Sequence, residues 1–137
     1  MKSSVRKFVR RRAGQRCEYC RLHESDQPLL RFHIEHVIAR KHHGGDDPRN
    51  LAWACLECNL VKSSNLSGRD TVTGRTVVLF NPRRQRWSRH FTWQGARLVG
   101  LTPCGRATAD VLNINMPHRI RLRELLIWGG VFPPQDE

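Results

Sequence analysis

The sequence reads CEYC at residues 17–20 and CLECNLVK at residues 55–62, and these two segments decide the fold. Each contains a Cys-x2-Cys pair, and residues 21–54 separate the pairs. Four thiolates at two such spacings are the ligand set of a tetrahedral structural zinc site. A redox-active disulfide would require only one pair after a thioredoxin-like strand, and structural disulfides are disfavoured in a reducing cytosol. We therefore predict that Cys17, Cys20, Cys55 and Cys58 bind one Zn²⁺ ion and that Cys104 is a small packed residue.

The length and composition fit one domain with an extension. The chain has 137 residues, of which 39% are hydrophobic and 26% are charged, and chains divide into large domains only above roughly 250 residues. The strongly apolar run at residues 125–128 is far shorter than the roughly 20 residues that cross a bilayer. The basic segment 1–15 lacks the apolar centre of a signal peptide. We expect a bacterial, cytoplasmic protein associated with the nucleoid.

The charge of the chain indicates its partner. There are 24 Lys and Arg residues against 12 Asp and Glu, a formal net charge of +12. Residues 1–16 and 71–109 are rich in Arg and contain no acid. A field of this sign attracts polyanions, and Arg favours forked contacts with phosphate. We expect a nucleic-acid partner in the form of double-stranded DNA, and a homodimer is also compatible with the sequence.

The chain around the cysteines predicts two strands and a helix. Residues 3–14 have the spacing of a short amphipathic helix with a cationic face. Residues 29–38 mix apolar and polar side chains as a half-buried strand does, and residues 51–54 form a short apolar strand. The Gly-rich segment 42–48 forms a loop between them, and a helix follows over residues 58–66.

The predicted fold class is therefore α+β, with zinc joining the open ends of a strand, loop, strand and helix. We expect a basic N-terminal helix at 1–15, the core at 16–67, an extension packed on it at 68–130, and a tail at 131–137.

Within this frame, a set of short motifs resembles a known family. The motifs are Glu35-His36, Gly44-Gly45, Asn50-Leu51 and the run from Cys55 to Lys62. Together they resemble the HNH endonucleases of the ββα-metal fold, in their four-cysteine, treble-clef-like version. The resemblance covers about residues 16–67. The letters of the family name fall on His36 and Asn50, and Asn59 stands where many members have His.

The resemblance implies a role for each motif residue. His36 would be the general base that activates water. Glu35 and Asn59 would hold a catalytic Mg²⁺ or Mn²⁺ ion, because both offer hard oxygen ligands. Asn50 would brace the loop and orient His36 through a hydrogen bond. Glu35 stands where many relatives have Asp, so its side chain is longer by one methylene group.

Other interpretations of these residues stay open. Adjacent residues on a regular strand point to opposite faces, so Glu35 and His36 share a site only if the strand ends or bulges there. Asn59 could instead cap the helix, and Lys62 contacts a phosphate or is merely solvated. Three further histidines have no assigned role: we expect packing or a phosphate contact for His33, whereas a DNA contact is open to His42 or His43.

The extension predicts hairpins and helices. Strands at 76–80, 87–93 and 96–101 alternate with turns at 81–82 and 94–95, and helices begin at 102–103 and 117. Arg83, Arg84 and Arg86 would lie at a hairpin tip and contact nucleic acid. Trp87 and Trp93 fit the core better than a base-stacking surface.

Three classes of function remain after these observations. The motifs favour a metal-dependent endonuclease that hydrolyses phosphodiester bonds in DNA. The alternative is a non-catalytic, zinc-stabilised nucleic-acid-binding module, which would not need Glu35, His36 and Asn59. A treble-clef protein-interaction module is the third, although it would have little use for a charge of +12.

Overall fold

The computed structural model describes residues 2–135, and the chain divides into two compact units. The first unit extends to Leu66 and also contains Asn81–Arg84, whereas the second contains Ser67–Phe80 and the residues from Gln85 onward. The division after Leu66 lies close to the predicted end of the core. The return of residues 81–84 to the first unit is a feature that the sequence did not predict.

The first unit begins with the predicted N-terminal helix, α1 (Ser3–Arg12). It ends where Gly14 adopts a left-handed backbone, φ 64°, which glycine tolerates without strain. Val9 is fully buried, and two arginines of the helix bind backbone carbonyls beside or within the strand pair. Arg6 Nη2 donates to the carbonyl of Phe32 at 2.9 Å, and Arg12 Nη2 donates to the carbonyl of Leu51 at 2.6 Å.

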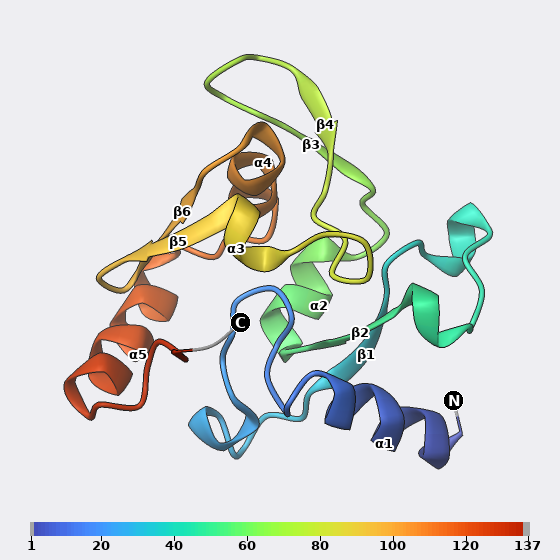
Figure 1. Ribbon diagram of the computed structural model, residues 1–137, viewed down its shortest axis with the longest axis horizontal. Coiled ribbons are helices and arrows are strands. Elements are labelled where there is room, and N and C mark those ends of the chain that lie inside the picture. Colours follow the sequence, from blue (N-terminus) through green and yellow to red (C-terminus); the bar gives the residue numbers. More distant parts are fainter. Residues whose placement is uncertain (1, 136–137) are drawn as a thin grey trace. The chain divides into compact units, whose positions relative to one another are not determined.

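The centre of the first unit is an antiparallel strand pair with one helix against it (Figure 1). Strand β1 (His33–His36) pairs with β2 (Leu51–Ala54), with Glu35 opposite Ala52 and His36 opposite Leu51. All four residues of β2 are buried. Helix α2 (Leu56–Lys62) follows at once and packs on β1. This is the predicted ββα unit, with the helix beginning two residues earlier than expected and ending four residues earlier.

Short 3-10 turns complete the connections of the first unit. They are η1 (Glu24–Asp26) before β1, and η2 (Arg40–His42) and η3 (Pro48–Asn50) in the loop between the strands. Asp47 caps η3 through its side chain, which accepts from the Arg49 amide. The loop is therefore built from defined turns, although its sequence shows no helical or strand period.

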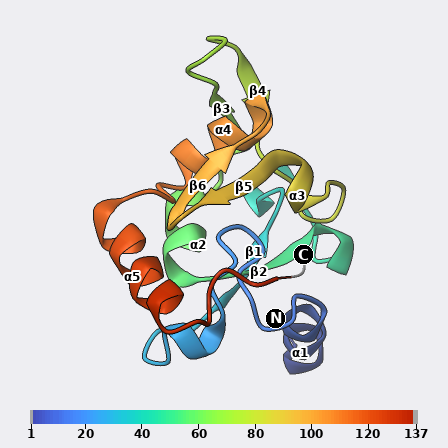
Figure 2. The ribbon, with the colours of Figure 1, turned by 60° about the vertical axis from the view of Figure 1, so that its left-hand side comes forward.

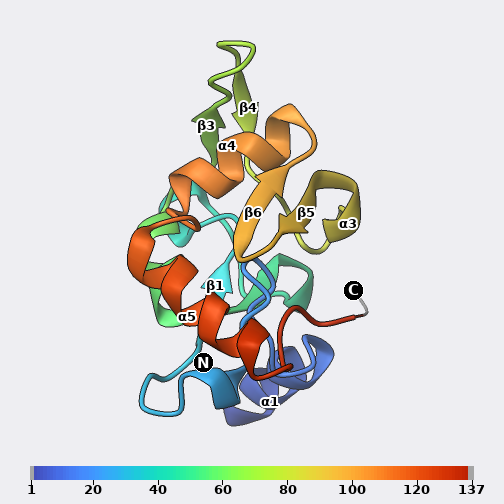
Figure 3. The same cartoon turned by 90° about the vertical axis from the view of Figure 1, so that its left-hand side faces the viewer.

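The second unit contains two hairpins and three helices. Strand β3 (Ser67–Arg69) pairs with β4 (Thr76–Val78), and β5 (Phe91–Gln94) pairs with β6 (Arg97–Gly100). Helix α3 (Trp87–His90) precedes β5, and α4 (Pro103–Val111) and α5 (Pro117–Trp128) follow β6. Figures 2 and 3 show α4 lying beside both hairpins.

The second unit confirms one predicted hairpin and corrects the other. The pairing of β5 with β6 confirms the turn at 94–95. The predicted hairpin of 76–80 with 87–93 is wrong, because β4 pairs with the preceding strand β3 and residues 87–90 are helical. Trp87 is buried, and its ring lies 5.1 Å from that of Phe91 and 5.8 Å from that of Trp93. Both tryptophans therefore belong to an aromatic cluster, in which Trp87 is buried, as predicted, whereas Trp93 is half-buried.

Candidate metal centre and active site

The four predicted zinc ligands lie together in the first unit. Their Sγ atoms are within 4.8 Å of one another, and all four cysteines are buried. Tetrahedral zinc with Zn–S bonds of about 2.3 Å requires sulfurs about 3.8 Å apart, and Cys20 Sγ and Cys55 Sγ are 3.7 Å apart. The four cysteines can therefore hold a metal ion such as zinc. Cys104 lies in the second unit, outside this cluster.

Local backbone structure places the sulfurs. In the first knuckle, the Cys17 amide donates to Leu22 O at 2.8 Å, and Arg21 takes a left-handed conformation that closes the turn. In the second, Cys55 is the N-cap of α2 and its sulfur accepts from the Cys58 amide at 3.4 Å. Hydrogen bonds from neighbouring sulfurs raise the pKa of Cys55, and burial raises that of Cys58. Four thiolates are therefore stable in this place only together with a cation.

His36 and Asn59 line one open hollow of the first unit. The hollow has a volume of about 540 Å³ and lies between the end of β1, the start of the following loop and α2. His36 reaches it from the last position of β1, and Asn59 from the middle of α2. The helix begins at Leu56 with Cys55 as its cap, so Asn59 lies too far along α2 to be the capping residue. Its amide is available to a ligand in the hollow.

The ring of His36 is held by an acid that the sequence analysis did not single out. His36 Nε2 lies 2.8 Å from Asp46 Oδ1, and Arg40 Nη2 lies 3.0 Å from the same oxygen. The hydrogen bond with His36 lowers the pKa of Asp46 most, and the bond with Arg40 lowers it further. An ionised carboxylate only accepts hydrogen bonds, so Nε2 carries the proton. In neutral His36, the lone pair is therefore on Nδ1.

Asn50 closes the loop that carries Asp46. Its Oδ1 accepts from the Ile38 amide at 2.9 Å, and its Nδ2 donates to the carbonyls of Ile38 and Gly45, each at 2.9 Å. Gly44 fits only as glycine, because a Cβ atom there would lie 1.7 Å from Ile38 O. Asn50 thus braces the loop as expected, but Asp46 makes the hydrogen bond to His36 that the sequence analysis gave to Asn50.

Glu35 points to the opposite face of β1 from His36. The strand is regular, and Glu35 is the one residue of β1 that is buried. Its Oε1 accepts from Lys62 Nζ at 2.5 Å and its Oε2 from Tyr19 Oη at 2.6 Å. Burial raises the pKa of Glu35, and the bonds with Lys62 partly oppose that rise. Although Glu35 contributes to the wall of the hollow, its carboxylate is engaged in the interior.

Lys62 has a different environment from the predicted one. A phosphate contact requires an exposed ammonium group, but Lys62 is 1% exposed. Besides Glu35, its Nζ contacts the carbonyl of Val37 at 3.0 Å. The reason is the helical spacing, which turns position 62 of α2 toward β1. Lys62 therefore ties the end of β1 to α2.

The three predicted nucleic-acid-binding arginines do not share a hairpin tip. Arg83 and Arg84 belong to the first unit and Arg86 to the second. Arg83 pairs with the buried Glu18, and burial followed by the charge of Arg12 lowers the pKa of Arg83 to about 10. Arg84 and Arg86 are exposed.

The remaining histidines lie outside the hollow. His42 and His43 are exposed in and after η2. Burial, followed by the charges of Arg6 and Arg31, lowers the pKa of His33, so this imidazole lies among cations. Within residues 2–135, the four cysteines are the one group of three or more His, Cys, Asp and Glu side chains placed to hold a metal.

Sequence reasoning missed Asp46, Arg40 and Tyr19. Asp46 and Arg40 lie in a loop without periodicity, so no sequence pattern indicated them. For Tyr19, a signal existed: strand alternation buries Glu35, and a buried carboxylate needs hydrogen-bond donors from neighbouring elements.

Comparison with known proteins identifies the central segment. Residues 17–65 match the model of the HNH endonuclease family. Neither a curated protein nor a solved structure matched the chain. Among the described residues, no helix combines the length and the apolar character needed to span a membrane. The match covers both cysteine pairs, the two strands, the loop between them and α2. Residues 17–65 are therefore similar to the HNH endonuclease domain, and they form a ββα core with four clustered cysteines.

Proposed function

We propose that this protein is a metal-dependent endonuclease that hydrolyses phosphodiester bonds in double-stranded DNA. The observation that carries the proposal is the pairing of His36 Nε2 with Asp46 beside an open hollow that Asn59 also lines. This arrangement leaves Nδ1 of His36 free of the proton. A binding module without chemistry has no use for such an oriented imidazole.

His36 acts as the general base in this proposal. Its Nδ1 takes a proton from a water molecule in the hollow, and the resulting imidazolium is stabilised by the Asp46 carboxylate. Arg40 Nη2 also donates to that carboxylate and holds it in place. Asn50 keeps the loop closed, so that Asp46 stays within hydrogen-bond distance of His36.

The catalytic ion is Mg²⁺ or Mn²⁺ in this proposal, held by Asn59 and Glu35. When bound, such an ion neutralises charge on the phosphoryl oxygens and on the leaving group. The amide of Asn59 fits this role as it stands. Glu35 would have to lose its hydrogen bond from Lys62 to serve as a ligand, because both of its oxygens have protein donors. Cys17, Cys20, Cys55 and Cys58 would hold the structural Zn²⁺ ion.

The second candidate is a zinc-stabilised nucleic-acid-binding module without catalysis. The burial of Glu35 favours it, because a carboxylate predicted as a ligand of the catalytic ion is paired with Lys62 instead. Both candidates require the zinc site and the positive charge, so neither of those features separates them.

Cleavage of a supercoiled plasmid separates the two candidates. The purified protein is incubated with the plasmid and Mg²⁺ or Mn²⁺, and the controls omit the ion or add EDTA. Conversion to open-circle or linear DNA that depends on the added ion is expected. Binding of the plasmid without conversion, at every ion concentration, would favour the module.

A further inference from the structure

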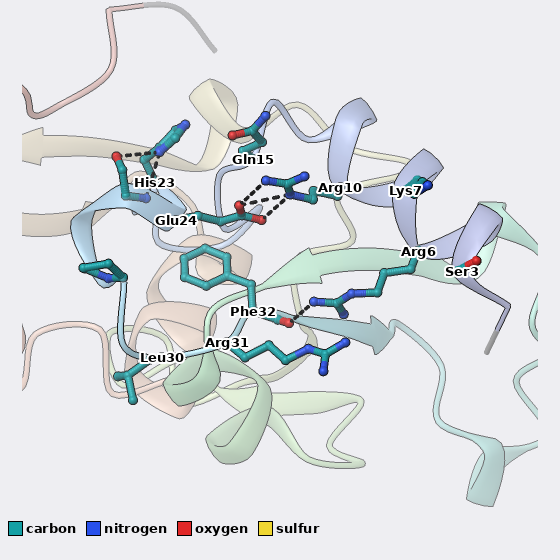
Figure 4. Close-up of a pocket in the computed structure, with 12 residues that line it drawn as sticks. Ser3, Arg6, Lys7, Arg10, Gln15, His23, Glu24, Leu30, Arg31 and Phe32 are labelled. Atoms are coloured by element: carbon teal, nitrogen blue, oxygen red, sulfur yellow. Dashed lines mark hydrogen bonds and ion pairs between the residues drawn. The ribbon is translucent and has the colours of Figure 1, made fainter.

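A groove in the first unit lies away from His36, between α1 and the segment that leads into β1 (Figure 4). Its volume is about 710 Å³. Helix α1 contributes Arg6, Lys7 and Arg10, and the facing segment contributes Arg31 and Phe32. Phe32 precedes β1 directly, and His36 ends that strand. Four residue steps of about 3.3 Å place the two ends about 13 Å apart.

The groove carries more positive charge than its own residues neutralise. Glu24 is the one acid among the described residues that line it, and Arg10 binds that carboxylate with Nε and Nη2 at 2.9–3.0 Å. Lys7 and Arg31 are exposed, and their side chains have no hydrogen bond or ion pair with another residue in the range 2–135. Two cations are therefore left to interact with a ligand.

Arg6 forms the fixed wall of the groove. Its Nη2 donates to the carbonyl of Phe32 at 2.9 Å, and its guanidinium lies 4.6 Å from the ring centre of Trp53. Figure 4 shows the side chains of Arg6 and Arg31 extending toward each other, Arg6 from α1 and Arg31 from the facing segment. After burial, the positive charge of Arg31 is the largest influence that lowers the pKa of Arg6. The two guanidinium groups repel each other, and an anion between them would relieve the repulsion.

We propose that this groove binds a backbone phosphate of the nucleic acid, through Arg31, Lys7 and the fixed guanidinium of Arg6. A guanidinium matches the geometry of phosphate oxygens with two parallel donors, and Arg6 loses little freedom on binding because the protein already holds it. The choice of a nucleic acid rests on the proposed function, whereas the choice of phosphate rests on the groove alone.

The experiment compares two double variants in the His36→Ala background, without added divalent ion, so that cleavage does not enter. Lys7→Gln with Arg31→Gln removes the two exposed cations of the groove that have no acidic partner. Lys2→Gln with Arg11→Gln removes the same charge from exposed positions outside the groove. Duplex binding is measured by fluorescence anisotropy over a range of salt concentrations, and circular dichroism verifies the fold of each variant.

The groove variant should reduce the slope of log K against log salt by about 0.9, the contribution of the one phosphate contact that the proposal assigns to the groove. The control variant should leave the slope within experimental error. An equal change in both variants would overturn the proposal, because net charge alone would then explain it, and so would an unchanged slope in the groove variant.

A second experiment tests phosphate binding in the groove independently of the proposed nuclease function. Inorganic phosphate is titrated into the protein while the Nε–H resonance of Arg6 is followed by NMR. A saturable shift that disappears in the groove variant supports the phosphate site even if no duplex binds. No shift in the parent protein would overturn it, and saturable binding of polyglutamate in place of both phosphate and duplex would overturn it as well.

Discussion

Lys62 Nζ lies 2.5 Å from Glu35 Oε1 in the interior of the first unit, and this pair joins α2 to β1. Each partner is at most 3% exposed. Tyr19, from the first cysteine knuckle, donates to the other oxygen of the same carboxylate. Glu35, the last but one residue of β1, is thus bonded to both α2 and the first cysteine knuckle. These bonds also position His36, the next residue of the strand.

Lys62→Met should destabilise the protein by about 3–5 kcal/mol, because it leaves a buried carboxylate without its cation. Glu35→Gln combined with Lys62→Met should recover part of that loss, since no buried charge remains. Urea unfolding measures both, with the exposed Lys41→Met as the control. Loss of less than about 0.5 kcal/mol in Lys62→Met would show that the pair does not hold the core.

The zinc content should depend on the four clustered cysteines and should not depend on Cys104. The parent protein should contain one zinc per chain, and Cys55→Ser should lose the metal and the fold together, because the small core of the first unit depends on the metal. Cys104→Ser should keep both. Metal analysis and circular dichroism check the outcome. A folded Cys55→Ser protein with full zinc occupancy would contradict the assignment.

His36→Ala and Asn59→Ala should fail in different ways. His36→Ala removes the base, so cleavage should fall by about 10²- to 10⁴-fold while fold and zinc content persist. Asn59→Ala removes an ion ligand, so raising the Mg²⁺ or Mn²⁺ concentration should partly restore its rate but not that of His36→Ala. His42→Ala, at an exposed imidazole outside the hollow, is the control. Plasmid cleavage by His36→Ala at the parent rate would refute the mechanism.

Asn50→Ala should loosen the loop that carries Asp46. Three hydrogen bonds disappear, two of them to backbone carbonyls, and we expect a loss of about 1–3 kcal/mol in stability. Cleavage should fall as well, while zinc content stays unchanged. Thermal unfolding and plasmid cleavage are compared with the exposed Asn65→Ala. If the two variants behave alike, the loop does not depend on Asn50.

Asp70 should make the second unit sensitive to acid. It is buried, and Arg106 binds it with Nε at 2.8 Å and Nη2 at 3.0 Å, which holds its pKa well below the usual range. Its contribution to stability is therefore present above the unfolded-state pKa of about 4 and is lost as the pH falls through the folded-state value. Asp70→Asn should be destabilised at pH 7, with a deficit that shrinks below pH 4.

The control for this prediction is Asp110→Asn, an exposed position on α4 in the same unit. Unfolding by urea at each pH, taken as the difference from the parent protein, removes any common effect of acid on the zinc site. A deficit of Asp70→Asn that is constant between pH 7 and pH 3 would exclude the ion pair as its cause.

The parts of the fold that depend on local sequence were predictable. The two Cys-x2-Cys spacings predicted the cluster, and Gly14 marked the end of α1, because metal spacing and backbone conformation are properties of a few adjacent residues. The partner of β4 was not predictable in this way. Its sequence fits a strand equally well beside β3 or beside residues 87–93, and only packing in the second unit decides between them.

Two residues of the candidate site could be predicted from the short motifs in which they stand. His36 and Asn59 line the same hollow, as expected from their motifs. Glu35 shows the limit of that reasoning, because strand alternation indicated an inward side chain while the family resemblance indicated an ion ligand, and the structure follows the alternation. Asp46 could not be predicted, since its meeting with His36 depends on how the η2 and η3 turns fold the loop back.

Because residues 81–84 belong to the first unit, the segment that matches the family does not contain every residue that its own core needs. Glu18 lies inside that segment, but the guanidinium that pairs with it belongs to Arg83, far outside the match. A gene fragment that stopped at residue 66 would encode a buried carboxylate with no counterion. Exchange of this domain between proteins would therefore have to carry the β3–β4 hairpin along, although neither strand contributes a residue to the hollow.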